Sequence, residues 1–83
     1  MRELKLTRKA LKDLKKLDKK VARLILITLE NFTSNPETVD IRKLQNKDNF
    51  WRIRVGDYRI IIKLEGKIIS TKAIGHRKDI YKK

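Results

Sequence analysis

The side chains best suited to chemistry in this sequence are arginines that alternate with apolar residues on either side of a short turn. Arg52 and Arg54 alternate with aromatic and β-branched residues, and Arg59 stands shortly after the dipeptide Gly56-Asp57. Such a dipeptide between two alternating runs predicts a β-hairpin, because glycine suits the first central position of a type II′ turn. The hairpin would place Arg54 beside Arg59, with their Cβ atoms roughly 5 Å apart. Because two like charges at that distance repel each other, the pair predicts a nearby anion.

The arginine hairpin is the first part of a predicted antiparallel meander. Its strands are expected over residues 50–55, 58–64 and 67–75. If Val55 pairs with Tyr58, one face of the sheet carries an aromatic and β-branched set, and the other carries Arg52, Arg54 and Arg59. The first set is Trp51, Ile53, Val55, Tyr58, Ile60 and Ile62. The first face would pack on helices, and the arginine face would meet solvent.

The second turn of the meander decides the position of one more basic residue, Lys72. A turn at Glu65-Gly66 is expected to pair Leu64 with Lys67. That register places Lys72 opposite Arg59, on the arginine face. A three-residue loop would shift the pairing and move Lys72 to the other face.

Two helices are predicted before the meander. Apolar residues recur at helical spacing from Arg8 onward, with Thr7 as the N-cap, and Asp18 can end the first helix and cap the second. The second helix is expected to end near Pro36, because proline disfavours helical geometry in the preceding residue. Residues 36–48 are interpreted as a connector, and residues 3–6 as a short strand. The fold class is therefore α+β: a short N-terminal strand and a helical hairpin packed on an antiparallel β-meander.

The composition limits the classes of function. The 83 residues are enough for one domain, residues 1–83, and 23 Lys and Arg against 10 Asp and Glu give a net charge of +13. A surface this positive favours a polyanionic partner, although charge alone does not separate RNA, DNA, anionic lipid and an acidic protein. With no cysteine and a single histidine, His76, disulfides, thiolate zinc sites and a histidine-rich metal site are excluded. We find no signal peptide or membrane-spanning run, so we expect a cytoplasmic protein.

The order helix–helix–meander, the string WRIRVGDYRIII and the ending GHRKDIY together resemble the RelE/ParE toxin superfamily, in particular its RelE ribonuclease branch. The resemblance covers nearly the whole chain and implies the RelE-like microbial RNase fold. It also implies a toxin of a type II toxin–antitoxin module that enters the A site of the 70S ribosome, against 16S rRNA, and cleaves the messenger RNA there. Such toxins need no metal or cofactor, and a cognate RelB-like antitoxin holds them inactive.

The resemblance also assigns site residues. The family's basic pair falls on Arg52 and Arg54, its strand arginine on Arg59, its basic residue after the last strand on Arg77, and its C-terminal aromatic on Tyr81. Some members carry lysine where this chain has Arg52. Because arginine stays protonated in proteins, that position suits a phosphate clamp rather than a general base, and the base stays open.

The implied chemistry is attack of a ribose 2′-OH on the adjacent phosphorus. Arg59 and Arg77 are expected to stabilise the transition state, while Arg52, Arg54 and Lys72 hold the RNA backbone. Tyr81 would stack on a base or transfer a proton, or else serve as an apolar anchor. His76 is a candidate for proton transfer, because histidine exchanges protons near neutral pH. The alternative is that it is a strand-end residue with no chemical role.

Two other functions compete with RNA cleavage. A ParE-like toxin would poison DNA gyrase by binding it, and a small basic module would bind nucleic acid without any activity. The arginine face together with GHRKDIY favours the ribonuclease, because a gyrase poison has no need for phosphate-stabilising groups. A basic module would explain the charge of +13 but not the ordered set Arg59, Arg77 and Tyr81.

Overall fold

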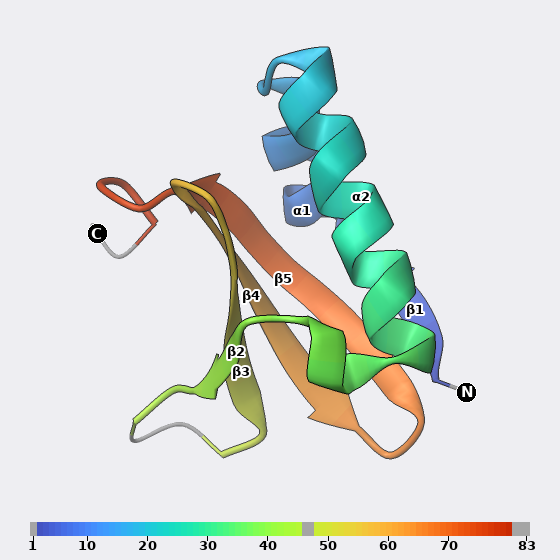
Figure 1. The fold of residues 1–83 in the computed structure, drawn as a ribbon. Coiled ribbons are helices and arrows are strands. Elements are labelled where there is room, and N and C mark those ends of the chain that lie inside the picture. The colour runs from blue at the N-terminus through green and yellow to red at the C-terminus, as the bar shows by residue number, and fades with distance from the viewer. Residues whose placement is uncertain (1, 46–47, 81–83) are drawn as a thin grey trace.

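Two helices lie on one face of a five-stranded sheet (Figure 1). The computed structural model describes residues 2–45 and 48–80. Its elements are β1 (Glu3–Leu6), α1 (Arg8–Lys15), α2 (Lys19–Ser34), a short 3-10 helix η1 (Pro36–Thr38), β2 (Ile41–Lys43), β3 (Phe50–Val55), β4 (Tyr58–Glu65) and β5 (Ile68–His76). The strand order is β1-β5-β4-β3-β2, with β1 parallel to β5 and the other neighbours antiparallel. The α+β fold expected from the sequence is confirmed.

The ends of the helices follow the predicted signals. Thr7 occupies the N-cap of α1, where its Oγ1 accepts a hydrogen bond from the backbone N–H of Ala10 at 3.1 Å. Asp18 occupies the N-cap of α2, although its side chain makes no capping hydrogen bond. The second helix ends at Ser34, and Pro36 begins η1, where its missing N–H costs nothing.

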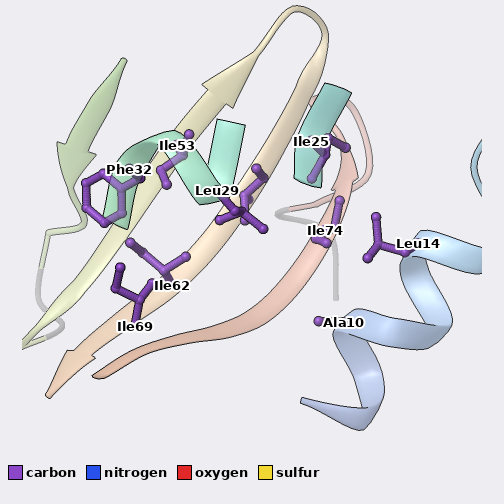
Figure 2. Close-up of a cluster of buried hydrophobic side chains, with 10 residues drawn as sticks. Ala10, Leu14, Ile25, Leu29, Phe32, Ile53, Ile62, Ile69 and Ile74 are labelled. Carbon is purple, nitrogen blue, oxygen red and sulfur yellow. The ribbon is translucent and has the colours of Figure 1, made fainter. Parts of the chain in front are cut away.

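The core lies between α2, α1 and the helix-facing side of the sheet. Figure 2 shows Ile25, Leu29 and Phe32 of α2 pointing towards the side chains of the strands. The buried apolar residues are Ala10, Leu14, Ile25, Leu29, Phe32, Ile53, Ile60, Ile62, Ile69 and Ile74. Fully burying one such aliphatic or aromatic side chain contributes about 1.5–3 kcal/mol, so this cluster holds the helices on the sheet.

The register of the first hairpin agrees with the prediction. Val55 pairs with Tyr58, and Arg54 pairs with Arg59. Gly56 has a φ of 59°, whereas Asp57 has no positive φ, as a type II′ turn requires. The local turn chemistry therefore sets which residues of β3 and β4 share a face.

The predicted register of the second turn is wrong. The loop is Gly66-Lys67, and Glu65 pairs with Ile68, because the positive φ of 58° at Gly66 is again needed at the first central position. An irregularity between Ile61 and Ile62 shifts the pairing further along β5.

As a result, Arg59 pairs with Gly75, and Lys72 does not lie opposite Arg59. The backbone carbonyl of Lys72 instead accepts a hydrogen bond from Oγ1 of Thr7 at 3.3 Å, beside the start of α1.

The connector prediction for residues 36–48 is also wrong in part. Residues Ile41–Lys43 form the edge strand β2, in which Ile41 pairs with Ile53 and Arg42 pairs with Arg52. Three residues are too few for an alternating pattern to stand out, so only the pairing with β3 reveals this strand. In the described residues, no helix is long and apolar enough to cross a membrane.

Candidate nucleic-acid interface

The sheet face that points away from the helices carries a basic surface. Cross-strand partners share a face, and this face alternates with the one that buries Ile53 and Ile60. We name it the outer arginine face; it comprises Arg42, Arg52, Arg54, Arg59, Ile61 and Lys63. The prediction that Arg52, Arg54 and Arg59 share the face away from the helices is confirmed, and β2 adds Arg42 to that face.

The Arg54–Arg59 pair is compensated within the protein. Nε of Arg54 lies 2.8 Å from Oδ2 of Asp40, and Nη1 of Arg59 donates to the backbone carbonyls of Gly56 and Tyr58 at 2.9 and 3.0 Å. Because the Arg54 and Asp40 side chains are 56% and 41% exposed, their ion pair contributes no more than about 1 kcal/mol. The repulsion predicted for the two arginines is therefore relieved within the protein.

Arg77 reaches the same end of the sheet from β5. Its backbone N–H donates to the carbonyl of Asp57 at 2.7 Å, and its Nε lies 3.5 Å from Oδ1 of Asp57. Asp57 belongs to the turn between β3 and β4, which lies beside the end of β5 (Figure 1). The structure thus gathers Arg54, Arg59 and Arg77 around one turn.

His76 is placed differently. It pairs with Tyr58, and their rings meet edge to face with centroids 5.5 Å apart. Tyr58 and His76 lie on the helix-facing side of the sheet, as Ile60 and Ile74 do, whereas Arg59 lies on the outer face. Nδ1 of His76 accepts a hydrogen bond from the backbone N–H of Lys78 at 3.1 Å, so the neutral ring carries its proton on Nε2. In this form His76 presents Nε2–H as a hydrogen-bond donor.

The segment after β5 folds back over the sheet. The backbone N–H groups of Asp79 and Ile80 donate to the carbonyl of His76 at 2.8 and 2.9 Å. A Cβ at Gly75 would lie only 3.2 Å from Cδ1 of Ile80, so a glycine allows this close packing. Tyr81 lies outside the described residues.

A cavity of about 260 Å³ lies between this segment, α1 and the edge of β5; it is lined by Lys9, Asp13, Ala73, Ile74, Gly75, Asp79 and Ile80. Oδ2 of Asp13 accepts hydrogen bonds from the backbone N–H of Ile74 at 2.9 Å and from Nζ of Lys9 at 3.0 Å. The Asp13 carboxylate therefore accepts a hydrogen bond from a backbone N–H on the part of β5 that does not pair with β1. Among residues 2–45 and 48–80, no cluster of three or more His, Cys, Asp or Glu side chains is arranged to hold a metal ion.

Sequence reasoning missed three contributors to this interface: Arg42, Asp40 and the pairing of Asp57 with Arg77. The signal for Arg42 was weak, since only Ile41 marks the short strand that carries it. Asp40 is distant in sequence from its partner Arg54, and Asp57 is distant from its partner Arg77. No local pattern therefore connects either pair. From the sequence alone, Asp57 is predicted only to be a turn residue.

Comparisons with known proteins agree with this geometry. A family model described as the ParE toxin of the type II toxin–antitoxin system parDE matches residues 4–81. Toxin RelE3 of Methanocaldococcus jannaschii is 40% identical over 74 residues, 84% of each chain, and the putative toxin RelE1 of the same organism is 30% identical over 80 residues, covering 90% of this chain and 89% of that one.

Solved structures show the same fold. The RelB–RelE antitoxin–toxin complex from Methanococcus jannaschii aligns with a TM-score of 0.80 at 33% identity, covering 92% of this chain and 93% of that chain. The archaeal RelE–RelB complex from Pyrococcus horikoshii aligns with a TM-score of 0.79 at 26% identity, covering 94% and 97%.

Proposed function

Because the chain belongs to the RelE/ParE toxin family of type II toxin–antitoxin systems, we propose that it is an endoribonuclease that cleaves messenger RNA in the ribosomal A site. The observation that carries this proposal is the convergence of Arg54, Arg59 and Arg77 around the turn between β3 and β4. Three guanidinium groups at one end of a sheet suit a phosphate whose negative charge increases during reaction. The toxin names of its relatives in Methanocaldococcus jannaschii support the same class of function.

In the proposed reaction the RNA supplies its own nucleophile. The 2′-OH loses a proton and attacks the adjacent phosphorus, the bond from phosphorus to the 5′ oxygen breaks, and that oxygen takes up a proton. The products are a 2′,3′-cyclic phosphate and a 5′-OH. Arg59 and Arg77 stabilise the charge on the phosphoryl oxygens, each by about 3–4 kcal/mol if they act like other preorganised donors.

The proton donors and acceptors are the open part of this mechanism. Arg52 is a clamp rather than a base, because arginine stays protonated. His76 presents Nε2–H while Nδ1 is occupied, which favours a donor over a general base. Tyr81, water and the ribosome are the other candidate proton carriers.

A second candidate function is gyrase poisoning, favoured by the family model that is named for ParE toxins. The two functions separate cleanly in one experiment. Purified protein is added in parallel to programmed ribosomes and to DNA gyrase with supercoiled plasmid. We expect cut messenger RNA with cyclic-phosphate ends and unchanged gyrase activity; cleaved or relaxed plasmid with intact messenger RNA would overturn the ribonuclease proposal.

We also propose that the chain forms a complex with a RelB-like antitoxin. The related toxins from Methanococcus jannaschii and Pyrococcus horikoshii were solved as complexes with RelB. A net charge of +13 suits an acidic partner whose carboxylates meet the basic groups. Copurification from the native operon would support this, whereas a stable solitary toxin from the same operon would contradict it.

A further inference from the structure

The outer arginine face carries a second cross-strand arginine pair, formed by Arg42 and Arg52. The two are direct partners in the pairing of β2 with β3, so their side chains lie on the same face. They neighbour the Arg54–Arg59 pair, because Arg52 and Arg54 are two residues apart on β3. Two adjacent pairs of like charges therefore follow one another along the sheet.

The second pair is not compensated as the first one is. Arg54 has Asp40, Arg59 has two backbone carbonyls, and Arg77 has Asp57. In the part of the chain that the structure describes, Arg42 and Arg52 make no ion pair or side-chain hydrogen bond. Nε of Arg52 is also buried and lacks a hydrogen-bond partner there.

This arrangement favours a bound anion. Unpartnered like charges on adjacent strands repel, and an anion between them removes that cost. Because burial of Nε partly dehydrates the guanidinium of Arg52, its charge is less screened than that of a fully exposed arginine. An oxyanion at the terminal nitrogens would therefore be held more firmly than at an ordinary surface arginine.

The spacing of the two pairs points to the kind of anion. Residues two apart on a strand are separated by about 7 Å along it, which is comparable to the separation of neighbouring phosphates in an extended RNA strand. An extended acidic peptide also repeats its side chains on one side at about this spacing, but it carries carboxylates there only where its sequence alternates acidic residues. A polynucleotide backbone carries a negative charge at every step, whatever its sequence.

We propose that Arg42 and Arg52 form a phosphate subsite that binds the RNA phosphate next to the one at Arg54 and Arg59. The proposal rests on the proposed function for its choice of RNA as the ligand. It makes Arg42, a residue of the edge strand β2, a substrate-binding residue.

The chain offers a matched control for this inference. Arg42 and Lys43 are adjacent, exposed and both positive, but Lys43 pairs with Trp51 and lies on the opposite face. Arg42→Gln and Lys43→Gln therefore remove the same charge at the same place in the fold. Equal melting temperatures for both variants and the unmodified protein would establish that β2 is intact.

The first measurement needs neither cleavage nor ribosomes. A short single-stranded RNA with 2′-O-methyl groups throughout cannot be cut, and its affinity is measured over a range of salt concentrations. Arg42→Gln is expected to weaken binding about fivefold to tenfold and to lower the slope of log affinity against log salt by about 0.7, the value for one phosphate contact on a single strand. Lys43→Gln should change the affinity by less than about twofold.

The second measurement places the subsite. Ribosomes are programmed with a messenger RNA that has a 2′-deoxy nucleotide at the cleavage position and one neutral methylphosphonate linkage on either side of it. One of the two neutral linkages should weaken binding of the unmodified protein and have no additional effect on Arg42→Gln, which is the coupling expected of a direct contact.

The outcomes separate this inference from the proposed function. Equal losses of RNA affinity for Arg42→Gln and Lys43→Gln would overturn the subsite, as would a loss confined to binding of an acidic protein partner. If the protein does not cleave messenger RNA on ribosomes but the two variants still differ on free RNA, the subsite stands and the proposed function fails.

Discussion

Arg59 on β4 and Arg77, directly after the end of β5, both contact the turn between β3 and β4, and the proposed chemistry depends on both. Arg59→Ala and Arg77→Ala are each expected to lower the single-turnover cleavage rate on programmed ribosomes by about a hundredfold or more. Ribosome binding should weaken only modestly, because their contacts strengthen as charge builds on the phosphate. Lys12→Gln, on the exposed side of α1, is the control and should leave the rate unchanged. Equal effects on binding and rate would identify an RNA-docking face instead of an active site.

Asp57 is expected to act through Arg77. Its carboxylate lies 3.5 Å from Nε of Arg77, and both side chains are more than half exposed, so the pair itself adds little stability. Asp57→Asn should slow single-turnover cleavage about threefold to tenfold, because Arg77 loses one of the contacts that orient it. The melting temperature should stay nearly constant.

Asp79→Asn is the matched control for Asp57→Asn, since Asp79 carries the same charge near the same end of the sheet and makes no ion pair with any described residue. A rate loss of similar size in both variants would mean that the cleavage rate follows local charge rather than the position of Arg77.

At the scale of elements, the two meander turns have the same backbone geometry but different neighbours. Gly56 and Gly66 have φ values of 59° and 58°, and a Cβ at either would meet open space. Alanine at either position is strained by the backbone alone, so each variant should lose about 1–2 kcal/mol of stability. Denaturant unfolding measures that loss.

Only one of these turns carries the candidate site. The turn at Gly56 holds Arg59 and Arg77, whereas the turn at Gly66 lies at the opposite end of β4 (Figure 1). At a temperature where both variants are folded, Gly56→Ala should slow cleavage and Gly66→Ala should leave it unchanged. Similar rates for the two would show that the geometry of the first turn is irrelevant to the chemistry.

At the scale of the whole molecule, the charge of +13 is expected to affect binding to ribosomes more than the rate of the cleavage step. Affinity for ribosomes should fall by at least about tenfold between 50 and 200 mM salt, because bound cations are released from RNA when basic groups replace them. The single-turnover rate at saturating ribosome concentration should change little over the same range. A rate that falls in parallel with affinity at saturation would place the screened charges in the chemical step.

The sequence by itself determined the features that depend on near neighbours. The alternation of residues 50–63 and the glycine of the first turn were enough to predict which side chains of β3 and β4 share a face. Thr7 predicted the start of α1 because a cap involves residues three apart. The arginine face, and with it the expectation of an anionic partner, followed from these local rules.

Only the tertiary structure decided what depends on residues distant in the chain. The pairing of β2 with β3 brings Arg42 to Arg52 and Asp40 to Arg54, and the three residues of β2 are too few to show a period of two. The placement of Lys72 depended on the glycine of the second turn, which moves the pairing of β4 with β5 by two residues, and on the irregularity between Ile61 and Ile62, which offsets the remaining pairs by one more. Composition and spacing thus predicted a basic sheet, but long-range strand pairing decided which of its arginines have partners within the described part of the protein and which do not.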